Sequence, residues 1–215
     1  DVPSSSFFPG IPKKDPINSF YNEGIYVGYR YYETFNIPTS YEFGYGLSYT
    51  NFEYSNIQLD TDTIGNIKVC VTLKNIGRKT GKEIVQLYIS APTTEIDKPL
   101  YELKAFAKTT LLKPQESQIV SFLLSAKDLA SFQSGISSWV ADKGEYILSI
   151  GASVKDIRQK VSFHLPSSIL VEKVHDVLYP NFSIKDMNSA SRKVLKEIPP
   201  KRPTKRIPHD FLWHW

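Results

Sequence analysis

The chain has 215 residues, of which 41% are hydrophobic, so it can bury the core of one domain with extensions or of two small domains. Its single cysteine, Cys70, excludes an internal disulfide, and no apolar run is long enough to span a bilayer as a helix. The whole net charge of +4 lies in residues 166–215, which hold nine Lys or Arg and five Asp or Glu.

Residues 1–22 predict a loop, because four prolines and a run of three serines oppose long regular structure. The sequence starts at Asp1 without an initiator Met or a charged-then-apolar leader, so we interpret this start as a cut in a longer protein. The N-terminus therefore gives no basis for predicting localisation, which stays unknown at this point.

Residues 23–50 form a segment rich in aromatic rings, and nine of the 13 tyrosines lie between Tyr21 and Tyr54. Rings carry a large apolar surface that needs cover, so we expect this aromatic segment to lie across another protein surface. Its four glycines predict a path with tight bends. The candidate site residues are those that would join domains or stack on sugar rings: Tyr26, Tyr29, Arg30, Tyr31, Tyr32, Phe43, Tyr45 and Tyr49. Of these two roles we favour joining domains, with Arg30 as a stacked or hydrogen-bonded interdomain anchor rather than a substrate ligand.

From Phe52 onward the pattern changes to short alternating strands separated by turn signals. The expected strands cover residues 54–59, 67–73, 83–90, 100–110, 118–124, 139–140, 144–151 and 159–164. Residues 75–81 predict a hairpin loop, and residues 125–128 predict a capping box that opens one helical turn. Because no helical crossovers separate the strands, we expect an all-β, antiparallel two-sheet sandwich. Tyr146, near the start of a late strand, is placed to bond back to upstream backbone.

Cys70 lies in a strand whose apolar neighbours Ile67, Val69, Val71 and Leu73 alternate onto one face. The thiol is expected on the opposite face, and no histidine lies near it in sequence to act as a base. We therefore interpret Cys70 as an ordinary strand residue.

The tail, residues 166–215, departs from the strand spacing. Residues 183–198 have apolar side chains at near-helical spacing and predict a short amphipathic helix, which Pro199 ends. Residues 191–206 hold seven Lys or Arg against the single acid Glu197, a pattern that could attract an acidic partner. Trp213 and Trp215 are candidate hydrophobic anchors.

Several motifs resemble a known enzyme family. The sequences E-G-I-Y-V-G-Y-R-Y-Y (23–32) and Y-E-F-G-Y-G-L-S-Y-T (41–50) are similar to the C-terminal region of glycoside hydrolase family 3, the β-glucosidase type. The runs 72–92, 97–109 and 127–132 resemble the fibronectin type III-like domain of those enzymes. The resemblance covers residues 1–158, whereas the part after residue 167 matches nothing expected of the family's core.

This resemblance implies three regions: residues 1–50 as a linker from an upstream α/β sandwich domain, 51–165 as a fibronectin type III-like β-sandwich, and 166–215 as a basic C-terminal extension. It also implies a parent β-glucosidase that hydrolyses terminal β-D-glucosyl residues with retention. The family's two catalytic carboxylates lie upstream, in a barrel and in or near the α/β sandwich, and no position here matches their motifs. We therefore assign no catalytic residue and expect the chain alone to be inactive.

The expected role is non-catalytic and structural, with the upstream barrel and α/β sandwich domains as partners and β-glucosides as the parent's substrates. A homo-oligomer contact is a further expectation. No metal site or cofactor is predicted, because the four histidines are scattered without cysteine partners. Nucleic acid is not an expected partner, since no nucleic-acid-binding fold accompanies the basic tail. A membrane is not expected either, because no apolar run is long enough to span one.

Two other functions stay open. A stand-alone carbohydrate-binding module would show exposed, coplanar aromatic rings on a sandwich face. An interaction protein acting through the basic tail would bind an acidic partner with a steep dependence on salt.

Overall fold

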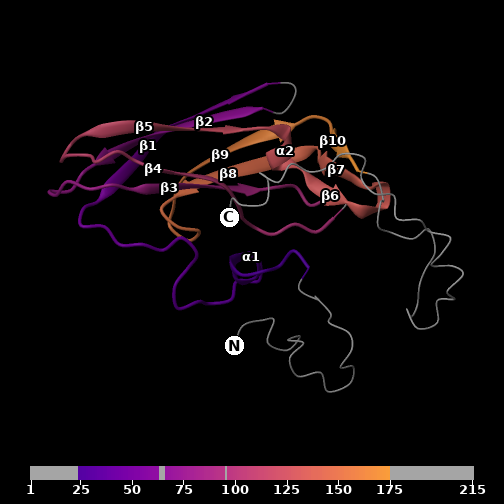
Figure 1. The fold of residues 1–215 in the computed structure, drawn as a ribbon, viewed down its shortest axis with the longest axis horizontal. Helices are drawn as coiled ribbons and strands as arrows, with labels where there is room; N and C mark the ends of the chain where they lie inside the picture. Colours follow the sequence, from indigo (N-terminus) through magenta and orange to yellow (C-terminus); the bar gives the residue numbers. More distant parts are fainter. Residues whose placement is uncertain (1–23, 63–65, 95, 175–215) are drawn as a thin grey trace, which may run out of the picture. The chain divides into compact units, whose positions relative to one another are not determined.

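The computed structural model describes residues 24–62, 66–94 and 96–174, which fold mainly into β-strands (Figure 1). The strands are β1 (Phe52–Thr61), β2 (Ile67–Asn75), β3 (Ile84–Ser90), β4 (Glu102–Lys108), β5 (Ser117–Leu124), β6 (Ser131–Gln133), β7 (Ser138–Ala141), β8 (Gly144–Gly151), β9 (Ile157–Leu165) and β10 (Ile169–Lys173). The helical elements are α1 (Tyr29–Thr34), α2 (Ala126–Leu129) and the 3-10 turn η2 (Ser134–Ile136).

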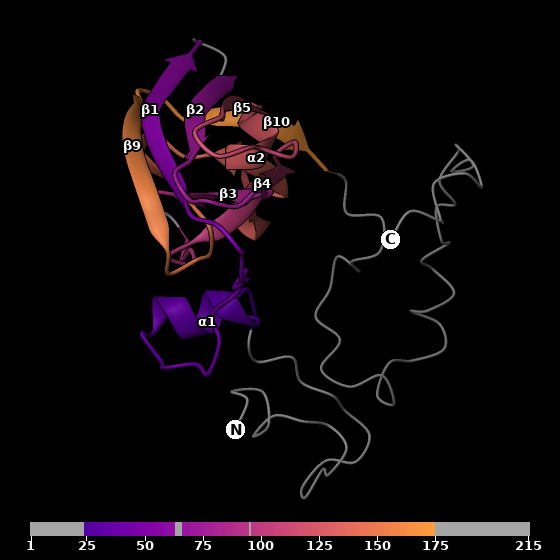
Figure 2. The ribbon, with the colours of Figure 1, turned by 90° about the vertical axis from the view of Figure 1, so that its left-hand side faces the viewer.

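The strands form a sandwich of two main sheets, seen from two directions in Figures 1 and 2. One sheet has the order β1-β2-β5 and the other β4-β3-β8-β9, and a smaller sheet has the order β10-β7-β6. The strand pairs of the two main sheets are all antiparallel over the described residues. The expected all-β antiparallel sandwich is therefore confirmed.

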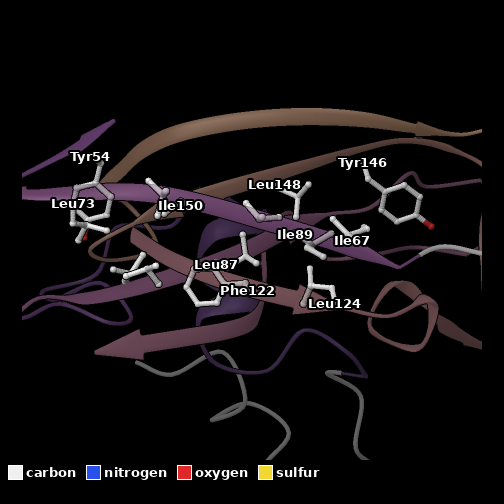
Figure 3. Packing of buried hydrophobic residues seen from close by; sticks show 14 of the residues in the cluster. Tyr54, Ile67, Leu73, Leu87, Ile89, Phe122, Leu124, Tyr146, Leu148 and Ile150 are labelled. Atoms are coloured by element: carbon white, nitrogen blue, oxygen red, sulfur yellow. The ribbon is translucent and has the colours of Figure 1, made fainter. Parts of the chain in front are cut away.

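The core lies between the two main sheets and takes side chains from both of them (Figure 3). In β2 the alternation predicted from sequence is observed: Ile67, Val69, Val71 and Leu73 are buried, whereas Cys70 faces the other way. The thiol of Cys70 lies 3.2 Å from the hydroxyl of Ser121 on β5. In the facing sheet, β8 contributes Tyr146, Leu148 and Ile150 to the core, and the intervening Ser149 is buried as well.

The connection over residues 75–81 is not the hairpin that its glycines predicted. β2 pairs with β1 and β5, whereas β3 pairs with β4 and β8, so residues 75–81 carry the chain from one sheet to the other. Gly and Asn signals indicate a reversal of the chain, but they do not say whether the next strand joins the same sheet.

The segment between β5 and β8 contains elements that the sequence only partly predicted. The capping box between Ser125 and Asp128 is present, and in it the backbone N–H of Ser125 donates to the Asp128 carboxylate at 2.7 Å. The Ser125 hydroxyl also donates to this carboxylate, at 2.8 Å. β6 and β10 were not expected; β6 has only three residues, and β10 lies past the expected sandwich boundary at residue 165. The helix expected over residues 183–198 lies outside the described residues.

Tyr146 forms the corner that its position predicted. Its hydroxyl donates to the backbone oxygen of Asp142, four residues upstream, at 2.7 Å. Burial raises the pKa of this buried phenol above its ordinary value, so the hydroxyl keeps the proton that it donates. The corner fixes the start of β8 relative to the loop that precedes it.

Candidate functional site

The aromatic segment is described from Gly24 and lies against the sheet that contains β3 and β4 (Figures 1 and 2). Gly24, Gly28 and Gly44 have positive φ angles, so three of the four glycines make the bends expected from sequence. Gly28 immediately precedes α1, whose six residues carry no side-chain cap. A helix this short depends on its contacts with the sandwich for stability.

Tyr29 is the main inward-facing ring of the segment. It stacks on Phe43 with 4.3 Å between ring centroids, and its edge-to-face contact with Tyr88 of β3 spans 6.3 Å. Its hydroxyl accepts a 2.8 Å hydrogen bond from the backbone N–H of Leu103 on β4. Tyr29 therefore joins α1 and Phe43, both in the aromatic segment, to β3 and β4 of the sandwich.

Gln86 of β3 holds the turn at Gly44. Its buried amide donates to the backbone oxygens of Gly44, at 3.1 Å, and Ala152, at 2.5 Å. Its oxygen accepts the hydroxyl of Tyr88 at 2.5 Å. Burial raises the pKa of Tyr88, so this phenol stays protonated and acts as the donor.

Thr50 ends the segment in a niche made by the 75–81 connection. Its hydroxyl donates to the side-chain oxygen of buried Asn75 at 2.7 Å. A Cβ placed on Gly77 or Gly81 would collide with Thr50, so both glycines leave space for this side chain. The same Asn75 donates to the backbone oxygens of Lys79 and Leu112, at 2.8 and 2.9 Å.

Ion pairs add to the inner contacts of the segment. Arg30 lies 3.0 Å from Glu102 of β4, which also pairs with Lys104 at 3.1 Å. Glu33 lies 3.7 Å from Lys155 in the loop after β8. The structure thus places Arg30 in a contact within this chain, a partner that sequence reasoning did not name.

The other candidate residues divide into two groups. Tyr26, Tyr31 and Tyr32 are half-buried and form ring contacts around α1, with Phe35 touching both Tyr26 and Tyr31. Tyr45 and Tyr49 are exposed, with Tyr41 packed against Tyr45 at 5.3 Å. Leu47, which sequence reasoning did not include, is 89% exposed, and Tyr49 is 97% exposed.

A second exposed ring pair lies on the small sheet, where Phe132 of β6 contacts Trp139 of β7 at 5.5 Å. Their planes meet at 58°, and those of Tyr41 and Tyr45 meet at 44°. Neither pair is the coplanar platform expected of a carbohydrate-binding module. Recognising β6 as a strand would have revealed the Phe132 and Trp139 pairing.

A cleft of about 510 Å³ lies at the end of the β1-β2-β5 sheet where β1 and β5 end and β2 begins. Two of its carboxylates already have partners: Asp62 accepts from Asn66, and Asp128 accepts from Ser125. Across the residues that the structure describes, no group of three or more His, Cys, Asp or Glu could hold a metal ion. In the same part of the chain no helix has the length and apolarity to cross a membrane.

Comparison with known proteins shows what this chain is similar to. Residues 83–154 match the fibronectin type III-like domain. The chain is 39% identical to thermostable beta-glucosidase B of Acetivibrio thermocellus over 205 residues, covering 91% of this chain and 26% of that protein. The solved structure of beta-glucosidase 3B from Thermotoga neapolitana is 48% identical, with a TM-score of 0.73 over 79% of this chain and 23% of that one. A beta-glucosidase from Paenibacillus barengoltzii is 33% identical, also with a TM-score of 0.73, over 85% of this chain and 21% of that one.

This chain therefore spans about a quarter of the length of the relatives it matches. A match over 91% of the chain includes part of residues 166–215, so the similarity to the Acetivibrio protein extends past the region that carries the sequence motifs. The chain carries a fibronectin type III-like domain of the kind that family 3 β-glucosidases contain.

Proposed function

We propose that this chain is a non-catalytic accessory domain of a family 3 β-glucosidase, which it braces through the aromatic segment. The observation that carries the proposal is that the segment has two sides. Tyr29, Arg30 and the backbone oxygen of Phe43 bind it to the sandwich, whereas the side chains of Tyr45, Leu47 and Tyr49 are exposed. A plain solvated linker needs neither the inner contacts nor so many exposed apolar side chains.

The parent enzyme's reaction belongs to the same proposal: hydrolysis of terminal β-D-glucosyl residues with retention. Such chemistry uses two carboxylates about 5 Å apart, one as nucleophile and one as acid/base. Several carboxylates of this chain have structural partners instead, as Asp142 has Lys98 and Glu102 has Arg30. The reaction is therefore assigned to the remaining three quarters that relatives such as the Acetivibrio protein contain.

A chimera tests the proposal. The 215-residue chain would replace the matching segment of the Thermotoga neapolitana enzyme, and this chimera would be compared with the enzyme that lacks the segment altogether. We expect the chimera to hydrolyse p-nitrophenyl β-D-glucoside and to survive heating, and the shortened enzyme to aggregate or inactivate faster. The isolated chain should show no hydrolysis.

Two results would reject this role. If the shortened enzyme were as active and as heat-stable as the intact one, the domain would not be a brace. If the isolated chain bound cellobiose in a calorimetric titration, the carbohydrate-binding alternative would take its place.

A further inference from the structure

β5 (Ser117–Leu124) lies at the edge of its sheet, because in the order β1-β2-β5 it has a neighbouring strand only on the β2 side. Its register with β2 runs along the whole strand without a shift. Within the part of the chain that the structure describes, no backbone group of residues 117–124 is bonded to the backbone of any strand or loop other than β2. An edge strand of this kind presents a row of unpaired N–H and C=O groups to a further strand.

The open part of this edge runs from Ile119 to Leu123. At the start of β5, the side-chain oxygen of Gln118 accepts from the backbone N–H and the hydroxyl of Thr110, both at 2.9 Å, so Thr110 lies beside this end of the strand. Beyond it, Ile119 is 66% exposed and Leu123 is 78% exposed, with the exposed Ser121 between them. The alternate side chains belong to the core, where Figure 3 shows the last two: Val120, Phe122 and Leu124.

Every other described strand that ends a sheet has a feature that opposes pairing with another chain. Such features are charged side chains, β-bulges and short length. β1 has a register shift between Ser55 and Gln58, and β6 has only three residues. β4, β9 and β10 carry charged residues, which are Glu102, Lys104, Lys108, Arg158, Lys160, Glu172 and Lys173. β5 has no charged residue, no proline and no register shift, so its edge is the unprotected one among these strands.

Two copies of β5 can pair in the antiparallel sense about a two-fold axis at Ser121. Opposite residues of an antiparallel pair project from the same face of a sheet, so this pairing sets Ile119 of each copy opposite Leu123 of the other. On the other face it sets Val120 opposite Phe122. An axis at Val120 would instead set Ile119 opposite Ser121, and the exposed apolar side chains would not meet. The apolar pattern of β5 is therefore complementary to itself in the pairing centred on Ser121.

Charges at the two ends of β5 are complementary in the same pairing. The turn before β5 carries Lys113 and Glu116, and the Glu116 carboxylate already accepts from the backbone N–H of Lys113 at 2.8 Å. The cleft at the far end of β5 is lined by three carboxylates and one cation, which are Asp60, Asp62, Asp128 and Lys68. Antiparallel pairing directs the Lys113 side of one copy towards this acidic cleft of the other, so a second copy suits the edge in charge as well as in pattern.

We infer that β5 is a self-association edge, at which a second copy of this chain binds so that the two three-stranded sheets join into one sheet across a two-fold axis at Ser121. The assembly closes as a dimer, because each copy uses its unprotected edge in the same contact. The inference goes beyond the proposed function, since neither the parent's reaction nor the aromatic segment takes part in this contact.

Sedimentation equilibrium of the 215-residue chain tests the inference, and we expect a dimer that dissociates on dilution. Ile119→Lys with Leu123→Lys sets like charges opposite each other in the two-fold pairing, so it should raise the dimer dissociation constant by about tenfold or more. Ile119→Lys with Leu123→Glu sets opposite charges there and should restore dimerisation. Both side chains are exposed, so the urea unfolding midpoints of the two variants should stay close to that of the wild type.

A single cysteine at position 121 tests the position of the two-fold axis. Residues directly opposite in an antiparallel pair lie about 5 Å apart at Cα, which is within the span of a disulfide. Cys70→Ser accompanies Ser121→Cys, because the Cys70 thiol lies only 3.2 Å from the Ser121 hydroxyl and would capture a thiol placed there. With oxidised glutathione, this variant should form a disulfide-linked dimer on a non-reducing gel.

The matched control is Cys70→Ser with Ser117→Cys, which places the thiol on the same exposed face of β5. The two-fold pairing separates the two copies of position 117 by eight residues of strand, or about 26 Å. This variant should stay monomeric under the same oxidation.

Several results would overturn the inference. A wild-type chain that is monomeric up to its solubility limit has no such edge contact. A dimer that survives the double-lysine substitution is held by another surface, such as the exposed rings of the aromatic segment. A charge-swapped variant as weak as the double-lysine variant contradicts the pairing of Ile119 with Leu123. If the double-lysine variant does not fold, the cysteines decide: faster linking at position 121 than at 117 supports the inference, and equal linking rejects it.

Discussion

The hydroxyl of Thr50 donates a 2.7 Å hydrogen bond to the side-chain oxygen of Asn75, which is fully buried. This contact joins the last residue of the aromatic segment to the connection between the two sheets. Asn75 also receives the backbone N–H of Gly77 at 3.1 Å and donates to two backbone oxygens, so its four contacts tie three stretches of chain together. Through Asn75, the end of the aromatic segment is coupled to the fold of the sandwich.

Replacing Asn75 with Ala should destabilise the chain by about 3 kcal/mol, because several buried polar groups would lose their partners. Thr50→Val keeps the shape of the side chain and removes one donor, so it should cost only about 1 kcal/mol. Urea unfolding of the 215-residue chain measures both values. An Asn75→Ala variant no less stable than Thr50→Val would show that Asn75 does not hold these stretches together.

Much of the sandwich could be predicted from sequence, because alternation of apolar and polar residues along a strand indicates which side chains are buried. Ile67, Val69, Val71 and Leu73 alternate in the sequence and are buried in the structure, and Tyr146 makes the corner bond that its place predicted. Alternation says nothing about which strands pair, however. The crossing of residues 75–81 between sheets depends on distant partners such as Leu112, and this explains why a hairpin was the wrong prediction.

The sequence predicted the candidate site as a segment. It did not predict which residues of that segment contact the sandwich and which are exposed. Composition identified the rings, but whether a ring faces inward depends on residues far along the chain, such as Leu103 for Tyr29 and Gln86 for the turn at Gly44. Leu47 was missed because a single leucine among tyrosines gives no signal in sequence. Its exposure is a property of the folded chain, in which Gly44 and Thr50 are bonded to the sandwich on either side of Leu47.

Gly44→Ala should loosen the aromatic segment. Gly44 has a φ of +81°, and an added Cβ would collide with the Gln86 side chain. The left-handed backbone alone costs a non-glycine residue about 1–2 kcal/mol, and displacing Gln86 adds to that. Hydrogen exchange should therefore speed up at Val154, whose N–H bonds Phe43.

Gly46→Ala is the matched control for this change, because Gly46 lacks a positive φ and an added Cβ meets nothing within 4 Å. It should leave exchange at Val154 as it is in the wild type. Equal protection in both variants would mean that the Gly44 turn does not hold the segment.

Lys98→Met should unfold the chain far more readily than the loss of a surface ion pair. The Lys98 ammonium lies 2.5 Å from the Asp142 carboxylate, and the two side chains are only 4% and 3% exposed. Breaking a buried pair leaves an uncompensated charge and costs about 3–5 kcal/mol. Lys127→Met, which breaks an exposed pair with Glu172, should cost no more than about 1 kcal/mol. Similar unfolding midpoints for the two variants would show that the buried pair contributes no more than the exposed one.

Glu83 should make the chain less stable as pH rises above the ordinary pKa of a glutamate. Burial raises the pKa of Glu83 above 4.5, while the hydrogen bond from Tyr54 and the charge of Arg158 act in the opposite direction. A folded state with the higher pKa binds the proton more tightly than the unfolded state does. The stability that this proton contributes is complete below pH 4.5 and is lost as pH rises through the folded-state pKa.

Glu83→Gln isolates this effect, because the amide oxygen can still accept the Tyr54 hydroxyl but no longer ionises. Urea midpoints from roughly pH 4 to 8 should show the variant gaining stability relative to wild type as pH rises, with the difference levelling off above the folded-state pKa. Glu53→Gln, on the exposed side of β1, controls for the loss of one negative charge. A difference between Glu83→Gln and wild type that stays constant across the range would mean that Glu83 ionises equally easily in the folded and unfolded chain.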